Sequence, residues 1–222
     1  MARPPAGTIL GKDGVRRCGF AGTDPLYTRY HDREWGFPVR SDRRLFEKIC
    51  LEGFQSGLAW ITILRKRENF RAAFRNFEIE AVARMNARSV SRLLQDAGIV
   101  RHRGKIESTL NNARRSRELI REYGSLAAFC WSFEPDPSQR PRRVTPQALA
   151  KLTQTSESVA LSKALKERGW TFVGPTNCYA FMQAMGLVND HLDGCASRSE
   201  VEAARARFRP PRLGSDAILR RR

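Results

Sequence analysis

Two pairs of cysteine and histidine stand at opposite ends of this 222-residue sequence. Cys18 precedes His31 near the N-terminus, and His191 precedes Cys195 near the C-terminus. Two thiolates and two imidazoles complete a closed tetrahedral site, and this donor set favours zinc over hard cations. One shared structural ion would require the fold to bring both ends of the chain together. The alternative is two core cysteines with two surface or capping histidines, and spacing alone leaves both interpretations open.

The charge of the chain points to a polyanionic partner. Lysine and arginine total 40 residues against 23 acidic residues, which gives a formal net charge of +17. Such a field attracts nucleic acid, although a solvated basic surface from an arginine-rich proteome has the same composition. Hydrophobic residues make up 41% of the chain, which indicates a globular protein with a sizeable core.

Cysteine usage and hydropathy indicate the cellular compartment. The five cysteines are an odd number without framework spacing, which argues against disulfides and for a reducing compartment. Cys50, Cys130 and Cys178 lie in apolar helical context, so we expect them to be buried. No apolar run approaches the ~20 residues of a membrane span, and residues 1–12 lack the apolar core of a secretory signal. We therefore expect a bacterial-type cytoplasmic protein without a membrane partner.

The hydrophobic pattern predicts successive helices and no convincing alternating strand, so an all-α fold is expected. Asp24 and Pro25 are typical of a helix start, and Ser41 or Asp42 is expected to cap the next helix. The helices are expected to form two lobes, one from about 40–150 and one from the joined termini. The expected divisions are a flexible basic leader (1–16), a helical domain (17–196) and a mobile arginine-rich tail (197–222).

A tight turn between two predicted helices carries glycines and cations together, within a helix-hairpin-helix expected at about 90–115. Such turns expose backbone N–H groups at a helix start, and these groups hold a DNA phosphate without reading sequence. An ordinary helix–helix loop with solvated charges is the alternative. His102, in the same turn, is expected to be an exposed loop histidine. The expected DNA contacts of this turn are Gly98, Val100, Arg101, Arg103, Gly104 and Lys105.

A second unusual stretch places a carboxylate in an apolar segment. Glu52 is followed by Gly53, Gly57 and then Trp60. Burying a glutamate is costly unless its carboxylate is paired or hydrogen-bonded, so a buried glutamate indicates either a partner or a functional role. Aromatic side chains at 20, 27, 30, 35 and 60 are able to stack on a flat ligand, as a base pocket requires, although most aromatics at helical spacing belong to a core.

Taken together, these segments resemble the 3-methyladenine DNA glycosylase I family, within the helix-hairpin-helix DNA glycosylase superfamily. The matching motifs run in the same order over about residues 16–196. They include Arg17-Cys18-Gly19, Asp24-Pro25-Leu26-Tyr27, Tyr30-His31-Asp32, Glu34-Trp35-Gly36, Leu51-Glu52-Gly53, Trp60-Ile61-Thr62, Arg67-Glu68-Asn69, the block from Gln95 to Ile106, Phe172-Val173-Gly174 and Gly186-Leu187-Val188-Asn189-Asp190-His191.

The resemblance implies a role for each candidate residue. The implied ligands of one structural zinc ion are Cys18, His31, His191 and Cys195. Glu52 is implied to accept hydrogen bonds from a flipped base. The implied pocket aromatics are Phe20, Tyr27, Tyr30 and Trp60, and Gln55 and Leu58 are implied to enter the gap left by the extruded nucleotide. Phe20 departs from the family, which usually has a tryptophan there, so stacking is kept while an indole N–H donor is lost.

The resemblance also implies the activity, which is excision of N3-methyladenine from double-stranded alkylated DNA to leave an abasic site. N3-methylation makes the adenine cationic and weakens the glycosidic bond, so no strong nucleophile is needed. The hairpin holds no lysine placed for Schiff-base chemistry, and the aspartate that many superfamily members use does not follow it. We expect a monofunctional, monomeric enzyme that releases the base without strand cleavage or a nucleotide cofactor.

Two other classes of protein remain as alternatives. One is a noncatalytic helix-hairpin-helix module that binds DNA, and the other is a zinc-stabilised adaptor for RNA or protein. Glu52, Tyr30 and Trp60 favour the enzyme, because a pure backbone binder has no use for a carboxylate beside a base pocket. The sequence offers no solvent-facing aromatic platform of the kind that single-strand RNA readers use.

Overall fold

The computed structural model describes residues 5–211 of the chain. The strands are β1 (Thr8–Leu10) and β2 (Arg16–Cys18), and the short 3-10 helices are η1 (Gly19–Ala21), η2 (Arg75–Phe77) and η3 (Pro137–Gln139). The α-helices are α1 (Pro25–Arg33), α2 (Asp42–Gln55), α3 (Trp60–Arg65), α4 (Arg67–Ala73), α5 (Ile79–Ala83), α6 (Ala87–Leu93), α7 (Arg103–Tyr123), α8 (Leu126–Trp131), α9 (Pro146–Ala150), α10 (Ser156–Glu167), α11 (Pro175–Ala184) and α12 (Ala196–Arg207). None of the helices in this part of the chain is long and apolar enough to cross a bilayer.

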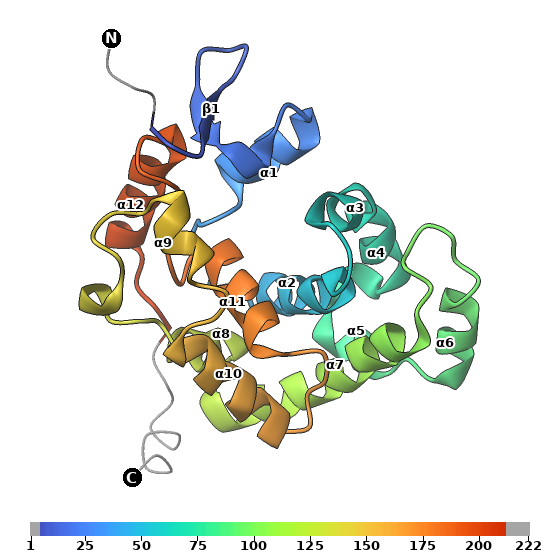
Figure 1. Ribbon diagram of the computed structural model, residues 1–222. Helices are drawn as coiled ribbons and strands as arrows, with labels where there is room; N and C mark the ends of the chain where they lie inside the picture. The colour runs from blue at the N-terminus through green and yellow to red at the C-terminus, as the bar shows by residue number, and fades with distance from the viewer. Residues whose placement is uncertain (1–4, 212–222) are drawn as a thin grey trace.

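The helices fall into two groups on either side of α2 and α11 (Figure 1). α3 to α7 lie on one side, whereas the strands, α1, α9 and α12 lie on the other. The second group therefore contains both ends of the described chain, as the expected two-lobed arrangement requires. α9 joins this group as well, because its Leu149 packs against a small buried cluster that contains Cys18, Val144, Leu192 and Cys195. The boundary of the middle lobe thus falls before α9 rather than at about residue 150.

α2 is the central helix of the fold. The Ser41 side chain caps its N-terminus by accepting the Arg44 N–H, as predicted. Every residue of α2 from Leu45 to Phe54 is buried, which is typical of a helix packed on all sides. The apolar side chains of this run supply much of the main core. Its charged side chains, in contrast, must be paired inside the protein because burial removes them from water.

The N-terminal segment contains a hairpin, so the fold is mostly helical rather than all-α. β1 and β2 pair antiparallel in the register Thr8 with Cys18 and Leu10 with Arg16. The Gly11 N–H donates to the Val15 carbonyl over 2.9 Å to close the turn. Strands of three residues are too short to show an alternating pattern, which is why the sequence did not predict them. The expectation of a flexible leader is therefore wrong for residues 5–16, which include a paired strand and the turn that follows it.

The segment expected to be a mobile tail continues as a packed helix. α12 buries Val201 completely, and Arg205 contacts Glu134 at 2.6 Å. The ring of Phe208 lies 4.4 Å from that of Trp131, measured between centroids. These few contacts bind an otherwise arginine-rich helix to the core, and its composition concealed them. The expectation of a mobile tail is corrected for residues 197–211, while residues 212–222 lie outside the described part of the chain.

The connection after α11 depends on a glycine. Gly186 has φ +78°, and a Cβ added there would lie 2.5 Å from the backbone carbonyl carbon of Phe37 and from the nitrogen of Pro38. We expect Gly186→Ala to lower the free energy of unfolding by about 2–4 kcal/mol, from left-handed strain and the backbone clash together. Gly124→Ala is the matched control, because Gly124 has φ +83° with nothing near the added Cβ. Gly124→Ala should lower the free energy of unfolding by only about 1 kcal/mol. Urea denaturation of both variants measures the difference, and equal losses would refute the predicted clash.

Candidate functional site

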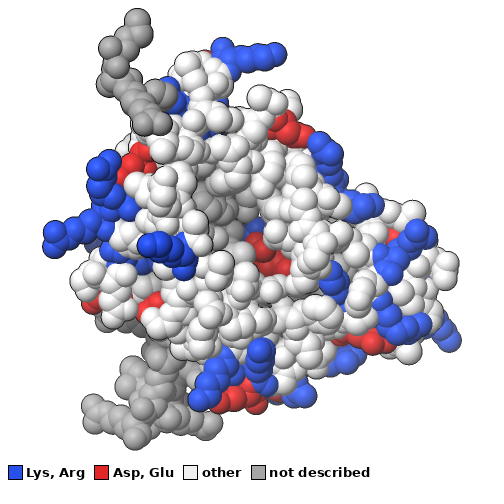
Figure 2. Space-filling view, viewed as in Figure 1, with Lys and Arg blue, Asp and Glu red and all other residues white. Residues whose placement is uncertain are grey.

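A cavity of about 160 Å³ opens between α1, α2, α3 and α11. Figure 2 shows a hollow in the face of the molecule, with acidic side-chain atoms inside it and lysines and arginines distributed around it. The cavity is lined by Phe20, Tyr27, Tyr30, Trp35, Lys48, Glu52, Gln55, Trp60, Ala180 and Gln183. Half of these residues are aromatic, which suits a flat ligand.

The fold brings together the residues that the sequence suggested for a base pocket. Tyr27 and Tyr30 lie one turn apart on α1, which begins after the predicted N-cap Asp24; its carboxylate accepts the N–H groups of Leu26 and Tyr27. Their rings approach each other at 6.3 Å, and the Tyr30 ring approaches that of Trp60 at 5.4 Å.

Two of the predicted residues lie toward the outside of the pocket. Phe20 is 40% exposed and packs its ring edge-on against Trp35 at 4.8 Å. Leu58 lies outside the main cavity and is 41% exposed. It lines a neighbouring groove together with Gln55, which borders both spaces. Gln55 and Leu58 thus lie beside the mouth of the pocket.

A buried ion pair on α2 forms the polar end of the cavity. Lys48 Nζ lies 2.8 Å from Glu52 Oε1, and the two side chains are about 6% and 5% exposed. The same ammonium donates to the Tyr30 hydroxyl over 2.8 Å and lies 3.2 Å from the centroid of the Trp60 ring. Lys48 therefore contacts the carboxylate and both inner aromatics at once.

Burial shifts the pKa values of the groups around this ion pair. Desolvation lowers the pKa of Lys48, although the neighbouring carboxylate of Glu52 acts in the opposite direction. Burial raises the pKa of Tyr30 well above its usual value, and the charge of Glu52 adds to this effect. The pKa of Tyr27 is raised for the same two reasons. Both tyrosines are therefore neutral hydroxyls at physiological pH.

Sequence reasoning did not identify Lys48. The available signal was its spacing, because a lysine and a glutamate four residues apart lie on the same side of a helix. In a helix that is buried on all sides, such a pair must face an internal polar site. The sequence analysis identifies Glu52 as a buried charge, and the structure adds its partner.

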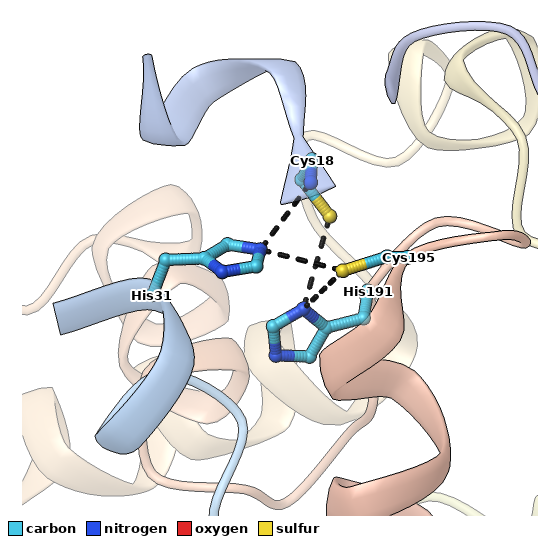
Figure 3. A group of neighbouring side chains, drawn as sticks. All are labelled: Cys18, His31, His191 and Cys195. Atoms are coloured by element: carbon cyan, nitrogen blue, oxygen red, sulfur yellow. Dashed lines mark hydrogen bonds between the residues drawn. The ribbon is translucent and has the colours of Figure 1, made fainter. Parts of the chain in front are cut away.

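The four cysteine and histidine residues at the two ends of the chain meet in one buried cluster (Figure 3). Their donor atoms all lie within 4.8 Å of one another. Cys195 Sγ lies 3.5 Å from both His31 Nε2 and His191 Nδ1, and Cys18 Sγ lies 3.8 Å from His191 Nδ1. The two cysteine–histidine pairs of the sequence are thus neighbours in the folded protein.

This donor set fits a tetrahedral metal ion. Ion–sulfur distances of about 2.3 Å and ion–nitrogen distances of about 2.0–2.1 Å place the donor atoms of such a site about 3.5 Å apart. The observed sulfur–nitrogen distances are close to this value. Hydrogen bonds from Cys18 and from both imidazoles lower the pKa of Cys195, whereas the pKa of Cys18 is raised by its contact with Cys195 and by burial. One thiolate is thus already favoured, and a bound cation would favour both.

The outer nitrogens of both histidines have partners that fix the orientation of the rings. His31 Nδ1 lies 2.8 Å from Asp32 Oδ1, and Arg17 in turn holds the Asp32 carboxylate with two nitrogens. His191 Nε2 lies 3.0 Å from the carbonyl oxygen of Trp35. Outer contacts of this kind select the histidine tautomer and are typical of metal sites. The remaining cysteines, Cys50, Cys130 and Cys178, are free and buried as expected.

α6 and α7 form the two helices around the predicted hairpin. The Gly98 N–H donates to Asp96 Oδ1 over 2.8 Å, and His102 caps α7 by accepting the Lys105 N–H. His102 is exposed, as expected. Arg101 and Arg103 are also exposed. The first turn of α7 leaves backbone N–H groups without an intrahelical acceptor, as every helix start does.

Lys105 differs from its expected role at the DNA surface. Its side chain is buried, and Nζ donates to the carbonyl oxygens of Phe54 and Ser56 over 2.9 and 2.6 Å. These carbonyls belong to the C-terminal end of α2, where a cation is favourable. The predicted phosphate contact through the Lys105 ammonium is therefore wrong, because that ammonium ties α7 to the end of α2.

Comparison with known proteins identifies the family. Residues 20–199 match the family model of methyladenine glycosylase, and the chain belongs to this family. It is 52% identical over 181 residues to DNA-3-methyladenine glycosylase 1 of Escherichia coli, covering 82% of this chain and 96% of that one. A crystal structure of 3-methyladenine DNA glycosylase I has a TM-score of 0.74 at 50% identity, with 81% and 98% of the two chains covered. A structure from Staphylococcus aureus that describes 3-methyladenine recognition has a TM-score of 0.75 at 37% identity, with 82% and 96% covered.

Proposed function

We propose that this protein is a monofunctional DNA glycosylase that excises N3-methyladenine from alkylated DNA. The observation that carries the proposal is the buried carboxylate of Glu52 in an aromatic cavity, in a chain of the methyladenine glycosylase family. The relatives named above act on or recognise 3-methyladenine. A base inside a duplex is inaccessible, so the damaged nucleotide must be flipped into the cavity.

The chemistry that this pocket must perform is modest. N3-methyladenine is cationic while it is attached to deoxyribose, so the bond from C1′ to the base is already weak. When that bond breaks, its electron pair goes to the base, which leaves as a neutral molecule. Water adds to C1′, gives up a proton and completes an abasic site. Glu52 and the faces of Tyr30 and Trp60 hold the cationic base in the geometry for this step.

Contacts to DNA are proposed around the mouth of the pocket and at the hairpin. Gln55 and Leu58 enter the gap that the flipped nucleotide leaves in the duplex. The backbone amides of the hairpin hold a phosphate, with the exposed cations beside it. The proposed hairpin contacts are the backbones of Val100 and Gly104 and the side chains of Arg101 and Arg103. A contact from the backbone of Gly98 would require its N–H to leave Asp96 Oδ1. The partner is double-stranded alkylated DNA, bound by a monomer in the bacterial cytoplasm.

The buried cluster is proposed to hold one structural zinc ion through Cys18, His31, His191 and Cys195. Two thiolates and two imidazoles leave no open position for water, so the ion would stabilise the fold and take no part in base release. It would also position the pocket, because Tyr30 is the neighbour of one ligand and Phe20 packs its ring 5.4 Å from that of His31.

Glu52→Gln tests the role of the carboxylate. We expect release of 3-methyladenine from alkylated duplex DNA to slow about 100-fold, because this factor corresponds to the loss of about 2.7 kcal/mol of stabilisation of the transition state, in which the base and C1′ share the positive charge. The measurement is single-turnover base release followed by chromatography, with DNA affinity measured in parallel and expected to be nearly unchanged.

Controls for this experiment come from the same chain. Glu80→Gln, at an exposed glutamate of α5, should release the base at the wild-type rate. The wild-type protein should leave the abasic strand intact in a denaturing gel. Wild-type activity in Glu52→Gln would contradict the pocket assignment, and efficient nicking by pure wild-type protein would contradict a monofunctional enzyme.

Cys195→Ser tests the proposed zinc site. Serine is a poor zinc ligand, so we expect the purified variant to have lost most of one zinc equivalent and to melt at a lower temperature. Metal analysis and thermal denaturation measure both effects. Cys178→Ser is the matched control, since Cys178 is equally buried but lies outside the cluster; it should keep its zinc even if its stability falls. Full zinc content and an unchanged melting temperature in Cys195→Ser would refute the site.

Arg101→Ala tests the hairpin. Removing one phosphate contact should lower the slope of log affinity against log salt concentration by about 1. Lys105→Met should leave the slope unchanged, because that ammonium points to protein carbonyls. Arg121→Ala, at an exposed position in the last turn of α7, controls for general charge. Fluorescence anisotropy at several salt concentrations gives the slopes. A normal slope in Arg101→Ala would remove this residue from the interface.

A further inference from the structure

Lys48 stands where a bound cation would be expected. Its ammonium contacts the Glu52 carboxylate at 2.8 Å and the Tyr30 hydroxyl at 2.8 Å, and it lies 3.2 Å from the centroid of the Trp60 ring. A carboxylate and an aromatic face are also the groups that attract a cationic base. The protein's own lysine therefore contacts the groups of this pocket that would bind a cation.

We propose that Lys48 is a specificity-determining residue whose ammonium competes with the cationic base for Glu52 and the face of Trp60. The inference rests on the proposed function, because it takes the ligand of this cavity to be a positively charged base. Its consequence is that Lys48 sets how strongly the pocket prefers charged bases over neutral ones. Without this lysine, the pocket would prefer charged bases over neutral ones more strongly.

The charges around the cavity support direct competition. Among the described residues that line it, Glu52 is the only carboxylate and Lys48 the only cation. The single negative charge is thus already balanced by one positive charge. A second cation beside Glu52 would meet repulsion from the ammonium at short range in a poorly hydrated site. A charged base must therefore displace Lys48 to reach Glu52, whereas a neutral base is able to enter the cavity beside it.

A second, smaller cavity gives the displaced ammonium a place to go. Lys48 lines both spaces, and the second one is bordered by Glu34 and Glu47. Both carboxylates already accept from arginines, Glu34 from Arg67 at 2.6 Å and Glu47 from Arg71 at 2.8 Å, so a displaced ammonium would share them with these guanidinium groups. Rotation of the side chain from Glu52 toward Glu34 would keep the ammonium near a carboxylate throughout.

Burial also makes this lysine easier to displace. Desolvation lowers the pKa of Lys48, and the positive charge of Arg67 acts in the same direction, whereas Glu52 and Glu34 oppose it. The ion pair with Glu52 therefore does not fully compensate for the loss of water around the ammonium. An incoming cation with a large apolar surface suffers a smaller desolvation cost at the same position.

The test compares two adenine ligands that differ in charge. The probes are the permanently cationic 3,9-dimethyladenine, as a salt, and neutral 9-methyladenine, and their dissociation constants are measured by isothermal titration calorimetry. With Lys48→Met, we expect the cation to bind about tenfold more tightly and the neutral ligand to change by less than about twofold. Lys48→Gln keeps a donor for Glu52 without the charge, and it should shift the two constants in the same directions.

The matched control is Lys163→Met, an exposed lysine on α10 whose removal should change neither constant. Melting temperature and metal content confirm that each variant is folded. A cation affinity that is unchanged or weaker in both Lys48 variants would overturn the inference, because the lysine would then be a structural group or a direct contact of the base. Base release by the wild-type protein tests the proposed function separately, so failure of one is distinguishable from failure of the other.

Discussion

The fold depends on the meeting of four donor side chains from the two ends of the chain. Cys18 and His31 come from the hairpin and α1, whereas His191 and Cys195 come from the segment between α11 and α12. Val144 and Leu192 pack against the two cysteines, and the rings of Phe20 and Trp35 pack against the two imidazoles. To this non-directional packing the polar cluster adds directional contacts, which fix how the terminal segments lie against each other.

The same junction sets the geometry of the pocket wall. Tyr30 and His31 are adjacent on α1, so one turn of helix presents a ring to the cavity and an imidazole to the cluster. The carbonyl of Trp35 accepts from the His191 ring, and Trp35 itself lines the cavity. On the opposite wall, α2 carries Lys48 and Glu52 within the main core. The pocket thus lies between two walls. Polar contacts to the cluster position the wall formed by α1 and Trp35, and close packing in the core positions the wall formed by α2.

Much of this arrangement could be predicted from the sequence, and the exceptions have physical reasons. Asp24 and Ser41 cap their helices as predicted, since capping is a local interaction between near neighbours. Glu52 and the pocket aromatics were found through motifs. In contrast, α12 depends on distant contacts of Val201 and Phe208, which composition conceals. Lys105 looked like a surface cation because only the tertiary fold brings the carbonyls at the end of α2 to it.

The placement of the four donors at the two ends also has a consequence for how the protein is made. A chain is synthesised from its N-terminus, and its early parts begin to fold before the later parts exist. Cys18 and His31 are made first, but their partners emerge only when nearly all of the chain is complete. Until then, α1 is held against α2 and α3 by contacts of its own, such as that of Tyr30 with Lys48, but the cluster is incomplete. A chain that ends before α11 would thus lack the cluster and the part of the pocket wall that Ala180 and Gln183 supply, and completion of the site would coincide with near-completion of synthesis.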